Sequence, residues 1–124
     1  MRTLGMTLMC LLVASLAQAQ TQAVGTETLV WDQAGTTAAA VQAFTYDVQD
    51  GSAAPVALTG VTCSGASSPF VCQTRLPALT TGLHAVSVRA RTVINGTPLV
   101  GSFSAPLSLL IVAVPAVPQN VRLL

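Results

Sequence analysis

The clearest pattern in this chain is a segment that alternates between two kinds of residue. One face of an extended segment would carry His84, Val86, Val88 and Ala90, and the other Ala85, Ser87, Arg89 and Arg91. A period of two residues is typical of a β-strand with one face in a core and one face in water. Thr80-Thr81-Gly82 precedes the segment and Asn95-Gly96 follows it, and both are turn sequences. The sequence therefore predicts a strand over 83–94, followed by a hairpin turn, against which the rest of the chain packs.

Residues 1–19 have the pattern of a cleaved signal peptide. Arg2 gives a positive start, Leu4–Leu16 is an apolar run, and an Ala-Gln-Ala cleavage pattern precedes Gln20. The alternative is a buried N-terminal helix. The run is too short for a stable membrane anchor, and Cys10 lies inside it rather than at its end, which argues against lipidation. We therefore expect a secreted or periplasmic protein without a membrane anchor.

The predicted mature chain has no net charge. Removal of Arg2 leaves four arginines against four carboxylates, and the chain contains no lysine. Such a surface gives no electrostatic footprint for nucleic acid or an anionic membrane. Solubility then depends on Ser, Thr and Gln, so self-association is an open alternative.

Two cysteines remain after removal of the leader. Cys63 and Cys72 flank a loop of eight residues. Because an exported protein meets an oxidising compartment, a disulfide is favoured over free thiols. A metal pair would need further ligands, and only His84 is available. The ring would stabilise the fold by about 2–3 kcal/mol on the chain-entropy model.

Other segments read as short strands separated by turns. They are 28–32, 41–48, 56–63, 70–76, and a bulged final strand made of 99–103 and 107–114. Residues 33–40 read as a loop, and Ala38–Gln42 as a helical turn that is short and uncapped. Trp31 is the lone tryptophan, which favours a central packing role over exposed ligand stacking. Six to seven strands predict an all-β Greek-key sandwich.

Four stretches carry a family resemblance. They are Leu29-Val-Trp31, Phe44-Thr-Tyr46-Asp-Val48, the run from Leu76 through Gly82 to Ala90, and Gly101 to Ser108. Together they resemble a fibronectin type III domain, within the immunoglobulin-like class, over residues 25–114. The resemblance implies a fold built on Trp31, Tyr46, Leu76, His84, Val86 and Val88.

The chain departs from that family in two places. His84 stands where the family has a corner tyrosine that bonds back to upstream backbone, and a histidine ring nitrogen can donate one such bond. Little precedes Thr28 where the family has its first strand, whereas 115–124 looks like such an opening strand. Residues 20–114 are therefore the predicted domain. We expect 115–124 to be a tail or the start of a linker or next domain, and pairing with an exposed edge is the alternative.

The sequence offers no catalytic, metal or cofactor set. A single histidine and no Gly-x-Ser-x-Gly elbow argue against a serine nucleophile. Phosphate-loop, dinucleotide and zinc motifs are missing, so we expect no enzyme and no cofactor. A hydrogen-bonded core role is favoured for His84. Arg89 and Arg91 read as a solvated pair, with contact to a carboxylate-bearing partner as the alternative.

Two functions follow as expectations. The first is a secreted, non-enzymatic binding or spacer module that contacts protein or glycan through loops or a strand edge. The second is a self-assembling structural protein, in which the apolar 107–114 strand or the tail augments a neighbour's sheet.

Overall fold

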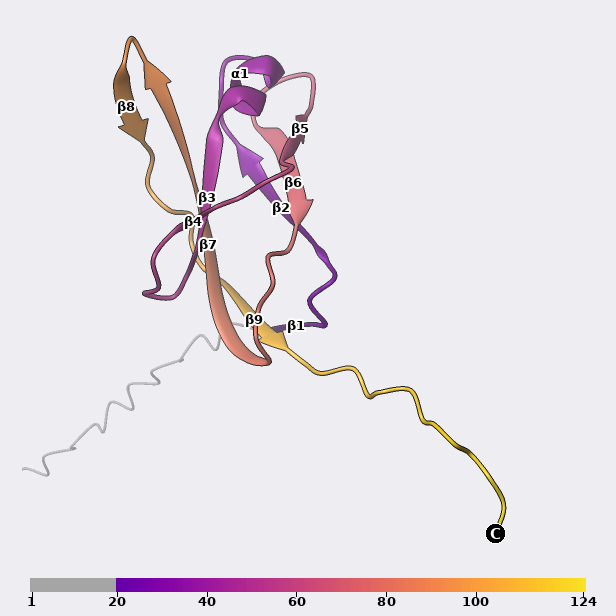
Figure 1. The fold of residues 1–124 in the computed structure, drawn as a ribbon. Helices are drawn as coiled ribbons and strands as arrows, with labels where there is room; N and C mark the ends of the chain where they lie inside the picture. Colours follow the sequence, from indigo (N-terminus) through magenta and orange to yellow (C-terminus); the bar gives the residue numbers. More distant parts are fainter. Residues whose placement is uncertain (1–19) are drawn as a thin grey trace, which may run out of the picture.

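The alternating segment forms the strand at the centre of the larger of two sheets. A computed structural model describes residues 20–124, and in it this strand, β7, spans Gly82–Ile94 (Figure 1). The turn residues Asn95 and Gly96 both have positive φ, 49° and 78°, as a tight hairpin requires. The predicted signal peptide lies outside the described residues.

The larger sheet has the strand order β1-β9-β7-β3-β4, and β8 pairs with the far half of β7. Its other strands are β1 (Thr21–Ala23), β3 (Thr45–Asp50), β4 (Val56–Ala57), β8 (Thr97–Val100) and β9 (Leu107–Ile111). β1 pairs with β9 in parallel, and the remaining neighbours are antiparallel.

The smaller sheet has the order β2-β6-β5, all antiparallel. Its strands are β2 (Thr28–Gln33), β5 (Thr62–Ser64) and β6 (Phe70–Arg75). Both sheets contribute to one core, whose buried residues include Leu29, Cys72, Leu76, Tyr46, Val86, Val88, Leu109 and Ile111. The chain is therefore mostly β and has two sheets, which agrees with the predicted all-β sandwich.

The prediction of a strand beginning at Val41 was wrong. A helix, α1, occupies Ala38–Ala43, and β3 starts only at Thr45. The helix is capped after all, because the Thr37 hydroxyl accepts a hydrogen bond from the Ala40 N–H at 3.1 Å. Val41 is fully buried, which explains why it looked like the start of an inward-facing strand.

The predicted strand over 56–63 is two strands in different sheets. β4 pairs with β3 in the larger sheet, and β5 pairs with β6 in the smaller one. Gly60 lies between them with φ 67°, a conformation that favours glycine. The chain crosses from one sheet to the other here, so the stretch cannot be one strand.

The predicted bulged final strand is present, but it ends earlier than expected. β8 and β9 both lie on the same side of β7, and the break between them is held by two backbone bonds, Gly101 N–H to Ala90 O and Ser104 N–H to Val88 O. β9 ends at Ile111 rather than Val114. Residues 112–124 form no strand and run away from the sheets (Figure 1). Within residues 20–124, no helix is both long and apolar enough to span a bilayer.

Candidate interaction surface

The β7–β8 hairpin extends past the strand that flanks it. The first residue of β3, Thr45, pairs with Arg91, so the remainder of β7 has only β8 beside it (Figure 1). Four large apolar side chains near the tip are exposed: Val93 at 64%, Ile94 at 54%, Leu99 at 47% and Val100 at 56%. A cluster of exposed apolar residues on a regular hairpin is typical of a contact surface.

Strand register divides the hairpin into two faces. Arg91 pairs with Val100 and Val93 with Pro98, and paired residues point to the same side. These four residues therefore share the outer face, where they line a pocket of about 410 Å³ together with Thr45.

The opposite face of the hairpin also borders a pocket of about 410 Å³. Leu99 and Thr92 are directly paired and form one wall. Phe44, at the end of α1, and Gln33, at the end of β2, form the other wall. The hairpin is thus accessible from both sides.

The two arginines of the outer face are fixed by a carboxylate of their own chain. Arg89 Nε donates to Asp47 Oδ2 at 2.9 Å, and Arg91 Nε donates to the same oxygen at 3.1 Å. The Asp47 residue is buried, with 4% exposed. Burial alone would raise the pKa of this carboxyl, but the hydrogen bonds and positive charges of the two arginines lower it below its ordinary value.

The guanidinium of Arg89 also lies over an aromatic ring. Its central carbon is 4.7 Å from the centroid of Phe103, a cation–π distance. Two arginines against one carboxylate leave this cluster, defined as Asp47, Arg89, Arg91 and Phe103, with a net charge of +1. The sequence predicts that both arginines point outward, but it does not pair them with Asp47, which lies in the expected strand 41–48. Contact of the arginines with another molecule stays a prediction.

His84 ties three segments together at the opposite end of β7. Its Nδ1 contacts Asp50 Oδ2 at 2.5 Å, and its Nε2 contacts the Thr80 carbonyl oxygen at 2.6 Å. The other Asp50 oxygen accepts the Ala85 N–H at 3.2 Å. The hydrogen bond to the Asp50 carboxylate, and after it the one to the Thr80 carbonyl oxygen, raise the pKa of His84 above its ordinary value. Both ring nitrogens face acceptors, which is the arrangement of an imidazolium that donates twice.

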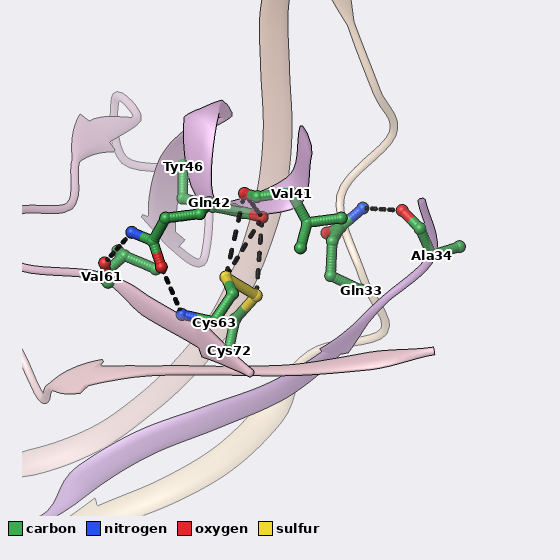
Figure 2. The surroundings of a disulfide bond; sticks show 8 residues. All are labelled: Gln33, Ala34, Val41, Gln42, Tyr46, Val61, Cys63 and Cys72. Carbon is green, nitrogen blue, oxygen red and sulfur yellow. Dashed lines mark hydrogen bonds between the residues drawn. A yellow bond between two sulfur atoms is a disulfide. The ribbon is translucent and has the colours of Figure 1, made fainter. Parts of the chain in front are cut away.

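The predicted disulfide between Cys63 and Cys72 is formed (Figure 2). It joins directly paired residues of β5 and β6. The Tyr46 hydroxyl donates to the Val41 carbonyl oxygen at 2.6 Å and lies 3.6 Å from each sulfur. Burial raises the pKa of this tyrosine to about 12. Cys72 is fully buried and Cys63 is partly buried against the core, so the bridge belongs to the packed interior.

The predicted fold-defining residues lie around this bridge and along β7. Tyr46, Leu76, Val86 and Val88 are buried. Trp31 is partly buried against the core, with its ring 5.1 Å from that of Tyr46 in an edge-on arrangement. Its indole nitrogen is buried and has no hydrogen-bond partner in the structure.

The described residues contain no group of three or more histidine, cysteine, aspartate or glutamate side chains that could hold a metal ion. Comparisons with protein-family models, with curated proteins and with solved structures found no match.

Proposed function

We propose that residues 25–114 form an immunoglobulin-like domain of the fibronectin type III kind. Strand order supports the immunoglobulin-like class, and the sequence resemblance supports the fibronectin type III kind. The orders β2-β6-β5 and β9-β7-β3 are those of the second, fifth and fourth, and of the seventh, sixth and third, strands of an immunoglobulin-like sandwich. The bond from His84 to the Thr80 carbonyl, four residues upstream, also resembles the bond of the family's corner tyrosine.

The proposed function is that of an exported, non-enzymatic module that binds another protein through the β7–β8 hairpin. The observation that carries it is the exposure of Val93, Ile94, Leu99 and Val100 on one regular hairpin. The Asp47 cluster supports this role, because it fixes two arginines on the same face of the hairpin as Val93 and Val100. A partner surface that is apolar with an acidic border would complement this hairpin.

A protein partner is favoured over a glycan. Sugar sites commonly present an aromatic ring for stacking, yet every aromatic side chain of the described region is buried or partly buried. The spacer role uses the same fold without a partner, and the binding experiment separates the two.

The experiment compares two exposed valines of nearly equal accessibility. Val93 is 64% exposed on the hairpin, and Val56 is 62% exposed on β4. The exported chain, its Val93→Asp variant and its Val56→Asp variant are immobilised and exposed to the extracellular or periplasmic fraction of the native host. Bound proteins are quantified by mass spectrometry.

We expect a protein that is retained by the native chain and by Val56→Asp, and that is reduced at least about tenfold with Val93→Asp, since a buried unpaired charge costs more than one factor of ten in affinity. Retention that is equal for all three chains, or absent for all three, contradicts binding through the hairpin.

Self-assembly is the second candidate function. It is favoured because the chain has both parts that strand exchange needs. β2 is an edge strand of the smaller sheet, and the tail carries exposed apolar residues.

A further inference from the structure

One edge of the smaller sheet is closed by a side chain. β5 lies at that edge, and the amide group of Gln42 lies against it (Figure 2). The Cys63 N–H donates to Gln42 Oε1 at 2.7 Å, and Gln42 Nε2 donates to the Val61 carbonyl oxygen at 2.7 Å. The amide takes the place of a neighbouring strand, so β5 cannot accept one without losing both bonds.

The outer strands of the larger sheet are short or contain proline. β1 has three residues and β4 has two, and Pro55 directly precedes β4. β8 has four residues, one of which is Pro98. Short strands and proline are the usual protections of an exposed edge.

β2 has none of these protections. It has six residues without a proline, and no other strand of the described region pairs with its second edge. The Leu76 N–H donates to the Glu27 carbonyl oxygen, so Glu27 is hydrogen-bonded across the sheet. Because every second residue of an antiparallel strand bonds to the same neighbour, Thr28, Val30 and Asp32 turn their N–H and C=O groups away from β6. Three residues of β2 therefore offer backbone donors and acceptors to an incoming strand.

The tail carries a segment that matches this edge in length and in pattern. Gln119–Leu124 has six residues without a proline, directly after Pro118. Val121 is 89% exposed and Leu123 is 98% exposed. Asn120 lies between the proline and these residues with φ 52°, so this one residue has to extend when the segment joins a sheet.

The alternating side chains of β2 and of Gln119–Leu124 match in only one of the two possible face assignments. Leu29 and Trp31 point to the core side of β2. If residue 122 lies opposite Val30, Val121 and Leu123 fall on that same side and extend the apolar face. Arg122 then points outward, diagonal to Asp32, where the charges are complementary. A shift by one residue would turn Arg122 toward the core.

We propose that the open edge of β2 binds the segment Gln119–Leu124 of a second copy of this chain as an antiparallel strand. The proposal rests on self-assembly, the second candidate function. It specifies Gln119–Leu124 as the donor strand and β2 as the acceptor strand. Antiparallel pairing is the more stable of the two directions. Because every copy carries one donor and one acceptor, association gives either a closed pair or an open chain.

The geometry favours a second copy over the chain's own tail. The Val112 N–H donates to the Ala23 carbonyl oxygen at 2.9 Å, so the tail leaves beside β1, near the start of β2. An antiparallel strand has to enter at the other end, at Gln33. Residues 112–118 reach about 22 Å when extended, which is roughly the length of β2, and no residues remain to reverse the direction.

The test is the association state of the exported chain, measured by sedimentation equilibrium over a range of concentrations up to about 0.5 mM, which covers weak strand pairing. The donor variant is Val121→Ser with Leu123→Ser. Its matched control is Val114→Ser with Val117→Ser, which removes two exposed tail valines outside the donor segment. The acceptor variant is Val30→Pro, which removes an outward N–H without touching the ladder to β6. Val30→Lys is a second acceptor variant, because its charge would face Arg122. Circular dichroism checks that each variant is folded.

We expect the native chain and the control to associate, and both the donor variant and the acceptor variants to lose association by at least about tenfold in dissociation constant, given several lost strand contacts. A mixture of donor and acceptor variants should form a heterodimer, since each supplies what the other lacks.

A native chain that stays monomeric at every concentration overturns the proposal, and protection of its tail from hydrogen exchange would then identify docking within one chain. Association that survives in the donor variant also overturns it, while self-assembly through another surface would stand.

Discussion

Removal of the Cys63–Cys72 bridge should cost a predictable amount of stability. The cysteines are nine positions apart, so the chain-entropy relation gives about 2.6 kcal/mol for opening the ring. Replacement of both cysteines by alanine also deletes the sulfur of Cys72, which is fully buried beside Tyr46. Deletion of one buried group of this size costs about 1 kcal/mol more. The double alanine variant should therefore lose roughly 3–4 kcal/mol in free energy of unfolding.

The assay is urea unfolding of the oxidised chain, followed by Trp31 fluorescence. The native chain kept reduced is the internal control, because it loses the ring but keeps both sulfurs. It should lose only about 2.6 kcal/mol. The difference between the reduced chain and the double alanine variant then gives the free energy contributed by packing of the buried sulfur. The Gln42 bonds to backbone atoms of residues 61 and 63 should hold the hairpin in both samples. A loss below about 1 kcal/mol in the reduced chain would refute the reasoning, as would two alkylatable thiols at Cys63 and Cys72 in the folded protein prepared without reductant.

Three further predictions concern the ion pairs and the helix cap. Asp47→Ala should lower the free energy of unfolding, measured in urea, by about 2–3 kcal/mol, because two arginines lose a buried hydrogen-bonded carboxylate. The control Asp32→Ala, at an exposed site, should change it by less than about 0.5 kcal/mol. Equal losses in the two variants would contradict this prediction. His84 has a raised pKa in the folded state, so its contribution is fully present below its ordinary pKa near 6.5 and is lost as pH rises through the higher folded value. The native urea midpoint should therefore fall from about pH 6 upward more steeply than that of His84→Gln, and parallel profiles would show that the contacts of His84 carry no charge. Thr37→Ala should cost about 1 kcal/mol through loss of the helix cap, and an unchanged midpoint would show that α1 is held by Val41 alone.

The sequence was most informative where one local rule decided the structure. β7 was predicted almost to the residue, because period-two alternation and the turn residues at both ends agree. The disulfide followed from the expectation of a signal peptide and from the two cysteines that would remain after its removal. Both features depend on short stretches of chain.

The errors lie where two rules competed. The apolar residues Val41, Phe44, Tyr46 and Val48 suggested one strand, but the cap at Thr37 and three alanines favour a helix before it. Between Val56 and Cys63 the hydrophobic pattern hid a change of sheet, for which Gly60 was the available signal.

The candidate surface could be predicted only in part. Arg89 and Arg91 follow from the alternation of β7. Their partner Asp47 is 42 and 44 positions away in the sequence, so no local pattern joins it to them. Exposure of Val93 depends on the point at which β3 begins, which is a property of strand register. The open edge of β2 likewise depends on β1 pairing with β9.

The central claim is that this chain acts by contacting another protein through the β7–β8 hairpin. The most direct measurement places a photo-crosslinking residue at position 93 or, as a control, at position 56, in the chain expressed in its native host. The account predicts a covalent adduct with a second protein from position 93 and none from position 56. Adducts that are absent at 93, or equal at both positions, would contradict it.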